Sequence, residues 1–416
     1  MKHIYIFIFI GFLLTPDLLL AQDKEDTSLF GIRFSGFVKN DAFFDTRQSV
    51  TAREGHFLLY PSPVVEDVNG NDIHAHPSFN MLSIQTRLTG NITGPDAFGA
   101  KTSGVIEGAF FGHSEPDISG FRLRLAYVVF NWGKTELLAG QYWHPLFAPQ
   151  AFPEVISFNT GVPFMPFSRN PQIRISRHLG LFTVSATAFS QRDFSTTGPE
   201  GPSSVYMRNA AIPNTNLLIT YSSQNKNHSF GLGGDYKVIV PEIVTENNYK
   251  TDSKLHSFAA MAFGKVEVNK TTWKIQALLG QNVYDLLMIG GYGMRYENYD
   301  SITGIKEYTN LNTGSVWTEL YTNSGKFQTG FYAGFTKNFG SLMNIMPGST
   351  VYARGTNINY VYRISPRILM RQGNATIAFE LEHTTAAYGT ANSLGVVSDT
   401  EEVSNLRALL SFIYRF

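Results

Sequence analysis

Apolar and polar residues alternate one by one in segment after segment of this chain. In Phe121–Phe130 the apolar face carries phenylalanine, leucine, tyrosine and valine, and the opposite face carries two arginines. Lys326–Phe339 repeats the pattern, with phenylalanine on one face and glutamine, threonine and asparagine on the other. A period of two over roughly eight to ten residues indicates a strand that has one apolar and one polar face. The chain is therefore expected to be all-β.

Sixteen segments of this kind are predicted as strands. By residue number they are 34–45, 78–90, 98–111, 120–131, 134–143, 171–177, 181–191, 213–223, 228–240, 253–267, 271–281, 315–323, 325–339, 350–364, 366–388 and 403–416. The connections alternate in length: turns such as 178–180 and 365–366 are tight and carry Gly or Pro, whereas 46–77, 282–314 and 389–402 are long. A soluble β-sandwich has no reason to sort its loops in this way. The pattern predicts a transmembrane antiparallel β-barrel of about 16 strands, with short periplasmic turns and long extracellular loops.

The N-terminus has the features of an export signal. Met1–Gln22 carries Lys2, an eleven-residue apolar run over 4–14, a Pro16 break and the small residue Ala21. A membrane anchor is the rival interpretation, but a spanning helix needs about 20 apolar residues. We therefore expect a cleaved signal peptide at 1–22. Residues 23–416 are then a single barrel domain in the outer membrane of a Gram-negative bacterium.

The composition excludes several other classes of protein. Lys plus Arg and Asp plus Glu both number 33, so the chain lacks the basic surplus of a nucleic-acid binder. The absence of cysteine excludes disulfide scaffolds and cysteine-ligated zinc. The 33 Phe and 20 Tyr residues are accounted for if many of them face outer-membrane lipid and lipopolysaccharide.

A basic wall is expected inside the barrel. If the apolar face of each strand points outward, six cationic side chains point inward from strands that become neighbours once the last strand pairs with the first; they are Lys39, Arg87, Lys101, Arg122, Arg124 and Arg407. Asp41 and Glu107 are interspersed among them. One interpretation is that these charges only keep a channel wet. The other is that they concentrate anionic solutes, because the guanidinium fork suits carboxylate and phosphate groups.

The connection 144–170 is the most apolar of the long loops. It holds five prolines and five phenylalanines, which makes full exposure to water unfavourable. We expect it to fold into the barrel and to narrow the pore, with Glu154 facing the basic wall. The alternative is that it packs on a neighbouring subunit or crosses the rim. The candidate constriction residues are Phe152, Glu154, Phe158 and Arg169.

The last strand ends in alternating aromatic residues. Phe412, Tyr414 and Phe416 share one face, which resembles the C-terminal signal read by the outer-membrane barrel assembly machinery. The plainer interpretation is a final amphipathic strand.

No cofactor is expected, although two weak metal signals are present. One offers oxygen ligands at calcium-like spacing; its residues are Asp67, Asn69, Asn71 and Asp72. Clusters of this kind are also ordinary turn chemistry. The other is the pair His74 and His76, which lacks the third ligand that a zinc site requires.

With these features in place, the sequence resembles the 16-stranded porins of Gram-negative bacteria, particularly the porin-like outer-membrane proteins of Bacteroidota and the DcaP-like porins. The segments that carry the resemblance are Gly36–Asp45, Arg53–Pro61, Phe121–Tyr127, Leu138–Pro145 and Pro166–Arg174. The resemblance implies a homotrimer, passive uptake of small hydrophilic and anionic solutes such as dicarboxylates, an inward-folded third loop, and Arg122 and Arg124 as pore residues.

Two other functions are compatible with an outer-membrane barrel. A structural or adhesive surface barrel would present the long loops 46–77 and 282–314 to a partner. An outer-membrane hydrolase would need a nucleophile and a base, for which Ser176 and His178 are the nearest pair. Residues two apart on a strand share a face without meeting in hydrogen-bond geometry, so no enzyme activity is expected.

Overall fold

The computed structural model describes residues 31–297, 299–323 and 325–416. The signal peptide expected at 1–22 lies outside these residues. Within them, no helix is both long enough and apolar enough to cross a membrane.

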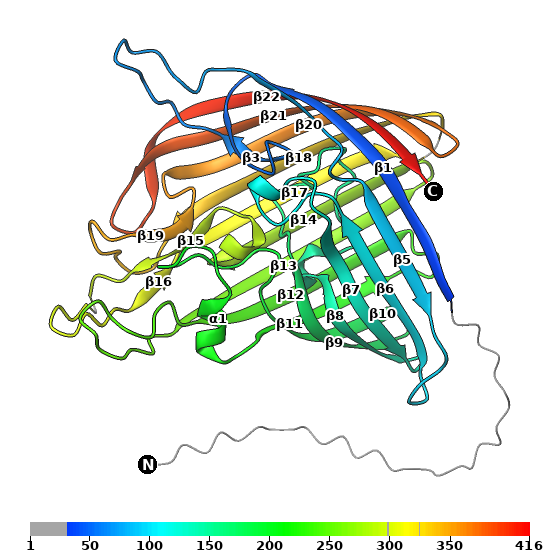
Figure 1. Cartoon of the computed structure of the whole chain (residues 1–416), viewed down its shortest axis with the longest axis horizontal. Helices are drawn as coiled ribbons and strands as arrows, with labels where there is room; N and C mark the ends of the chain where they lie inside the picture. The colour runs from blue at the N-terminus through cyan, green and yellow to red at the C-terminus, as the bar shows by residue number, and fades with distance from the viewer. Residues whose placement is uncertain (1–30, 298, 324) are drawn as a thin grey trace.

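A closed antiparallel sheet forms the body of the molecule (Figure 1). Counting β4 and β5 as one interrupted strand, its 16 strands are β1 (Gly31–Asp45), β4 (Ser78–Leu82) with β5 (Arg87–Thr93), β6 (Lys101–Ala109), β7 (Arg122–Asn131), β8 (Thr135–Trp143), β9 (Arg169–Leu179), β10 (Phe182–Phe189), β11 (Asn214–Ser222), β12 (His228–Ile239), β13 (Leu255–Val268), β14 (Thr271–Gln281), β17 (Asn312–Thr322), β18 (Phe327–Gly340), β20 (Ile358–Gln372), β21 (Ala375–Ala391) and β22 (Val397–Arg415). Each strand pairs with the next along the chain. The β22–β1 pairing, from Phe37↔Arg415 to Asp45↔Arg407, closes the barrel. The predicted fold class is confirmed.

The connections are sorted by length, as expected for this fold. Short turns such as 180–181 and 269–270 lie at one end, here called the short-turn end. Loops such as 46–77 and 144–168 lie at the other, the long-loop end. In outer-membrane barrels these ends face the periplasm and the exterior, respectively.

Two predicted connections are wrong. The turn expected at 365–366 is the middle of β20, where Pro366 lies opposite Phe331, and the true turn is at 373–374, where Gly373 has a φ of 55°. Proline forfeits one ladder hydrogen bond, which β20 tolerates because β18 and β21 pair with it along most of its length. The long loop expected at 389–402 is shorter, because the β21–β22 ladder continues to Ala391↔Val397 and leaves only 392–396 unpaired.

Smaller elements lie toward the long-loop end. The hairpin β2 (Ser49–Ala52) and β3 (Phe57–Pro61) forms a separate two-stranded sheet. A three-stranded sheet combines β15 (Gly290–Met294), β16 (Tyr308–Asn310) and β19 (Val351–Arg354). The helical segments are α1 (Val205–Ala210), η1 (Glu115–Asp117), η2 (Pro145–Phe147) and η3 (Val283–Leu286).

The two faces of the barrel wall differ in polarity. On β18, Phe327, Phe331, Phe335 and Phe339 are between 40% and 59% exposed, whereas Gln328, Tyr332, Thr336 and Asn338 on the other face are buried. The same alternation on β22 exposes Phe412 and Tyr414 and buries Leu409 and Ser411. Apolar side chains therefore cover the outside of the barrel and polar side chains line its interior, as the period-two pattern predicts.

Candidate functional site in the barrel interior

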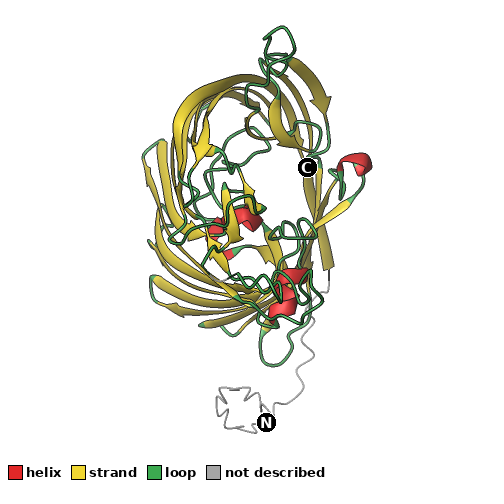
Figure 2. Cartoon of the chain, turned by 90° about the vertical axis from the view of Figure 1, so that its left-hand side faces the viewer, coloured by secondary structure: helices red, strands yellow, loops and turns green. Residues whose placement is uncertain are grey.

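Loops and short helical turns lie inside the ring of strands (Figure 2). The segment 144–168 is one of these loops, since most of its residues are buried and its backbone bonds to strands of the wall. Two glutamates on the inner wall accept hydrogen bonds from its backbone. The Glu154 amide donates to both carboxylate oxygens of Glu319 on β17 (2.9 and 3.0 Å). The Ile156 amide donates to Glu380 on β21 (2.5 Å). Because buried backbone N–H groups need an acceptor, these carboxylates fix the path of the loop.

The β2–β3 hairpin is a second inward segment. Loop 46–77 was expected at the surface, but all of β3 is buried. The Leu58 amide donates to Asn159 Oδ1 of the neighbouring segment (2.7 Å), and the Arg363 guanidinium of β20 donates to the Leu58 carbonyl (3.1 Å). The Phe57 and Phe158 rings pack edge to face at 5.3 Å. The two inward segments therefore form one packed unit within the barrel.

A cavity of about 390 Å³ remains between segment 144–168 and the inner wall. It is called here the basic cavity, because five cationic side chains and a single carboxylate line it. The cationic residues are Lys39, Arg87, Arg124, Arg371 and Arg415, and the acid is Glu154. Aromatic rings of the segment complete the wall, among them those of Phe147, Phe152 and Phe158.

The three predicted cations of this cavity are partly neutralised by the barrel wall. Lys39 Nζ lies 3.2 Å from Asp41 and also donates to the Ile156 carbonyl (2.6 Å). Arg124 Nε donates to Glu107 (2.7 Å), and Arg87 Nε lies 3.7 Å from the same carboxylate. These groups therefore contribute less net charge than their number suggests.

Arg371 and Arg415 are the cations that the sequence-based prediction left out of the wall. Among the described residues, neither has a carboxylate within 4.0 Å, and Arg415 donates to the Thr376 hydroxyl (3.1 Å). Arg415 could have been found, since the alternation of the last strand puts it on the inward face with Arg407. Arg371 was hidden by the misplaced turn at 365–366, which left the direction of its side chain undefined.

Glu154 lines the same cavity as Arg87 and Arg124, although its direct ion pair is with a different strand. Its carboxylate lies 3.0 Å from Lys274 Nζ on β14. Phe152 is adjacent, with Lys274 Nζ 5.3 Å from the centre of its ring. The Glu154 carboxylate therefore lines the cavity together with the cations, while Lys274 neutralises part of its charge.

Two other predicted residues meet at the long-loop end. Arg122 Nη2 and Arg169 Nε each donate to the buried Asp193 at 2.7 Å. Burial raises the pKa of Asp193, but the charges of Arg169 and Arg122 outweigh it and hold that pKa below its usual range. Arg169 was assigned to the loop. It is instead the first residue of β9, because its pairing with Trp143 extends the strand by two residues beyond the predicted start.

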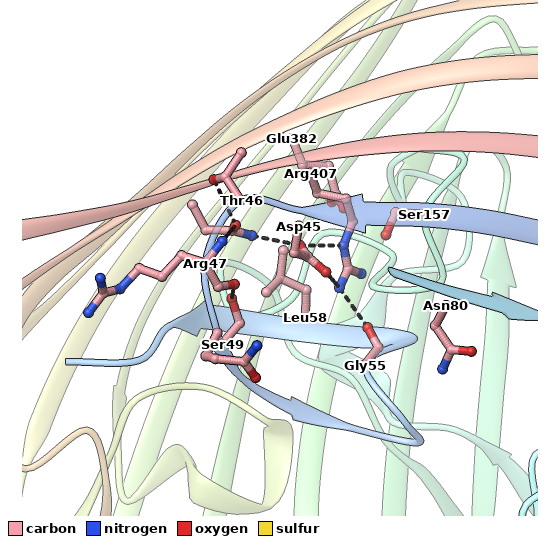
Figure 3. Close-up of polar contacts among 12 residues, drawn as sticks. Asp45, Thr46, Arg47, Ser49, Gly55, Leu58, Asn80, Ser157, Glu382 and Arg407 are labelled. Atoms are coloured by element: carbon pink, nitrogen blue, oxygen red, sulfur yellow. Dashed lines mark hydrogen bonds and ion pairs between the residues drawn. The ribbon is translucent and has the colours of Figure 1, made fainter. Parts of the chain in front are cut away.

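The remaining members of the predicted wall, Arg407 and Lys101, do not line the basic cavity. Arg407, near the long-loop end, forms a two-pronged ion pair with Asp45 at 2.9 and 2.7 Å (Figure 3). Lys101, at the short-turn end, lies 2.6 Å from Asp96 and its side chain is 78% exposed. The six residues come from neighbouring strands, but only Lys39, Arg87 and Arg124 line the basic cavity.

The weaker sequence signals have ordinary structural partners. Asp67 accepts hydrogen bonds from the Asn69 and Asn71 amides, and Asp72 pairs with Arg47 at 2.5 Å. Within the described ranges, no cluster of three or more His, Asp or Glu residues has a metal-binding arrangement.

Ser176 and His178, the pair considered for a hydrolase, each bond to a different hydroxyl group on β10. Ser176 Oγ bonds to Ser185 (2.9 Å), and His178 Nδ1 bonds to Thr183 (3.0 Å).

A closed 16-stranded barrel that holds an inward loop beside a charged cavity is the fold of outer-membrane channels of the porin type. The outer membrane channel DcaP of Acinetobacter baumannii is similar in structure, with a TM-score of 0.67 and 17% identity over 95% of this chain and 100% of that one. OmpT of Vibrio cholerae is similar at a TM-score of 0.52 and 10% identity, over 93% and 98% of the two chains. A trimer form of in-vitro folded OmpT gives 0.53. At these identities the likeness shows the fold alone.

No protein-family profile matches the sequence, and no curated protein matches it.

Proposed function

We propose that the protein is a porin of the Gram-negative outer membrane that lets small hydrophilic solutes diffuse passively and favours anions such as carboxylates. The observation that carries the proposal is the basic cavity, where five cationic side chains face one carboxylate inside a closed barrel. A charged, low-dielectric enclosure concentrates solutes of opposite charge by focusing the field. The planar guanidinium groups also suit carboxylates geometrically.

Conductance in planar lipid bilayers tests the pore. The purified full chain is expected to give stepwise single-channel currents, and a salt gradient is expected to give a reversal potential of the sign that marks anion preference. Absence of current steps from correctly folded protein refutes the pore. Cation preference refutes the selectivity while leaving the pore intact.

Arg371→Gln with Arg415→Gln is the sharpest variant for the selectivity, because among the described residues neither cation has a carboxylate partner that its loss would leave unpaired. The double variant is expected to lower the anion-to-cation permeability ratio with little change in folding. Arg177→Gln is the matched control, since Arg177 is exposed at the same end of the barrel and its neighbours Ser176 and His178 take the inward face. An unchanged ratio in the double variant contradicts the role of the cavity.

Export, assembly and oligomeric state belong to the same proposal. We infer a cleaved signal peptide, insertion by the barrel assembly machinery through Phe412, Tyr414 and Phe416, and contact of the outward face with lipid and lipopolysaccharide. The exposed aromatic rings on β22 support that orientation. A homotrimer is supported by the trimer form of the structurally similar OmpT. Cross-linking of the protein in native membranes tests the trimer.

A structural or adhesive surface barrel is the second candidate, and one observation favours it. Two inward segments occupy the interior, while the rest of loop 46–77 projects from the barrel with Val68 fully exposed (Figure 1). The bilayer experiment separates the two, because only a porin passes current. Neither candidate involves catalysis, and the proposal assigns no cofactor and no calcium to the protein.

A further inference from the structure

A second cavity, of about 610 Å³, lies at the long-loop end between loops 46–77, 110–121 and 190–213. It shares no lining residue with the basic cavity. Its charged side chains are Arg53, Arg122, Arg192, Asp193 and Glu115, and its apolar walls include Phe111 and Phe194.

Arg53 is the unusual member of this cavity. It is 6% exposed, and its guanidinium carbon lies over the Phe111 ring at 4.1 Å, with the Phe158 and Phe194 rings at 5.2 and 5.7 Å. Over the described part of the chain, its buried Nη1 has no hydrogen-bond partner. Burial lowers the pKa of Arg53 to about 9, so the group remains charged near neutral pH. A buried, charged donor without an acceptor is costly unless something supplies one.

The carboxylates beside Arg53 are already engaged. Asp193 binds Arg122 and Arg169. Both oxygens of Glu115 accept backbone amides, one from Arg53 itself and one from Glu54 (2.7 Å). Among the described residues, Arg53 therefore has no ion-pair partner, and Arg192 joins Arg53 and Arg122 as the third cation in the wall of the cavity.

Arg169 shows the same deficit a short distance away. It is 1% exposed, its guanidinium lies 5.5 Å from the same Phe111 ring, and its Nη1 also has no partner among the described residues. Arg122 lies 5.7 Å from that ring as well. Arg124 is the fourth cation near this ring, at 5.6 Å, but it is paired with Glu107. The other three cations, against two engaged carboxylates, leave a positive surplus beside the apolar rings.

We propose that this cavity is a binding site for an organic carboxylate with an apolar body, whose carboxylate binds the Arg53 guanidinium where it lines the cavity while its body rests against Phe194 and Phe111. Parallel N–H···O bonds to a carboxylate are the strongest match for a guanidinium group. The Phe111 and Phe194 rings favour a ligand with an apolar body over a small, fully hydrated anion, because only an apolar body gains from covering them. The site goes beyond the proposed porin, since it binds whether or not the barrel conducts.

Isothermal titration calorimetry on the detergent-solubilised full chain tests the site, with benzoate as the probe. Wild type is expected to show one saturable site, and Arg53→Gln is expected to weaken the affinity at least about tenfold by removing the fork. Arg53→Lys keeps the charge and is expected to fall between them. Arg208→Gln is the control, because Arg208 is exposed on α1 and lies outside the cavity. Equal affinity in Arg53→Gln and Arg208→Gln, or no saturable binding by wild type, overturns the proposal.

A comparison of two ligands on the wild-type protein keeps the test valid even if the Arg53 variants misfold. Benzamide has nearly the shape of benzoate without its charge, so it is expected to bind at least about tenfold more weakly. Equal binding of the two overturns the role of Arg53. Inorganic phosphate is expected to bind more weakly than benzoate, and the reverse order overturns the assignment to carboxylates with an apolar body. The two proposals fail in different measurements. Absence of current in bilayers refutes the porin and leaves the binding heats of benzoate unchanged.

Discussion

Arg407 is joined to both oxygens of Asp45 and also donates to the Gly55 carbonyl of the β2–β3 hairpin (2.7 Å; Figure 3). The two side chains are 2% and 5% exposed. A buried ion pair gains little over an apolar pair of the same volume, because both charges lose their water. Removing only one partner is far worse, since the other charge stays buried alone.

Arg407→Leu is therefore expected to lower the free energy of unfolding by about 3–5 kcal/mol. Urea titration of the protein in lipid vesicles measures the change. Asp45→Leu with Arg407→Leu is the control and is expected to recover most of the loss, because no unpaired charge remains. A single variant as stable as wild type would show that water or another group compensates Asp45.

His56 at the tip of the hairpin links docking to pH. Its Nε2 lies 2.6 Å from Asp41, its ring stacks on Phe158 at 4.7 Å, and Lys39 and Arg407 are the nearby cations. Burial lowers the pKa of His56, and the hydrogen bond to Asp41 offsets this only in part. The undocked hairpin then binds a proton more readily than the docked one. Docking is complete above the ordinary histidine pKa of about 6.5 and weakens as the pH falls below it.

Hydrogen exchange of the β3 amides, corrected for intrinsic rates, measures this effect between about pH 7.5 and about pH 5.5. Protection is expected to fall at the lower pH in wild type. His56→Gln cannot take up the proton, so its protection is expected to be the same at both values. A pH-dependent loss of equal size in His56→Gln would assign the effect to another group.

At the scale of elements, segment 144–168 is held by carboxylates of the opposite wall and not by a regular sheet. Glu380 is fully buried and accepts the Ile156 amide. Glu380→Ala leaves that N–H without an acceptor, which costs about 1–3 kcal/mol locally. Faster hydrogen exchange over 152–160 is the expected result. Glu401→Ala is the control, since Glu401 is exposed on β22, and equal exchange in the two variants contradicts the anchoring.

The elements that the sequence predicts well are those whose pattern is local. Strand alternation and loop length predict the barrel and its 16 strands, because the period of two is present in each strand. On β7 the predicted faces are wrong beyond Arg124, because a bulge shifts the alternation, buries Leu125 and exposes Val128. The β20–β21 turn was misplaced, since Pro366 imitates a turn residue and only the neighbouring strands β18 and β21 override it.

The interior contacts were beyond local pattern. No local pattern within Arg53–Pro61 predicts that the hairpin folds inward. Its partners Asn159, Arg363 and Arg407 are at least a hundred residues away in the sequence. In the sequence, Arg53 is part of a segment that resembles the porins and has no other distinguishing feature. Its significance depends on the Phe111, Phe158 and Phe194 rings, which come from three different loops.

At the scale of the whole molecule, the zero net charge hides a strongly charged interior. Cations gather around the basic cavity and the Arg53 cavity. Glu319, Glu380 and Glu382 face the inward segments, and Arg363 and Arg367 lie beside them on the same wall. The outer surface of the barrel carries the exposed phenylalanine and tyrosine rings. A neutral chain can therefore hold a charged interior within a lipid-compatible shell.

Variants in the aromatic residues at the end of the chain can distinguish an effect on barrel assembly in cells from an effect on the stability of the folded barrel. Phe412, Tyr414 and Phe416 are 48%, 56% and 56% exposed, and the backbone of Phe416 still pairs with Gly36 of β1 at 3.1 and 3.2 Å. Replacing the three side chains with alanine keeps the backbone pairing between the C-terminus and β1. If they are an assembly signal, the amount of folded protein in the outer membrane of cells falls several-fold, as read from the heat-modifiable band on a gel.

The matched control uses an outward phenylalanine face elsewhere in the barrel. Phe331, Phe335 and Phe339 on β18 are 46%, 40% and 51% exposed, so their replacement with alanine removes a similar lipid-facing area. Both triple variants are expected to lose similar stability after refolding into vesicles, since lipid contact is equivalent on the two strands. Only the β22 variant is expected to assemble poorly in cells. Equal assembly of the two variants would mean that β22 is an ordinary amphipathic strand, with its aromatic residues serving lipid contact alone.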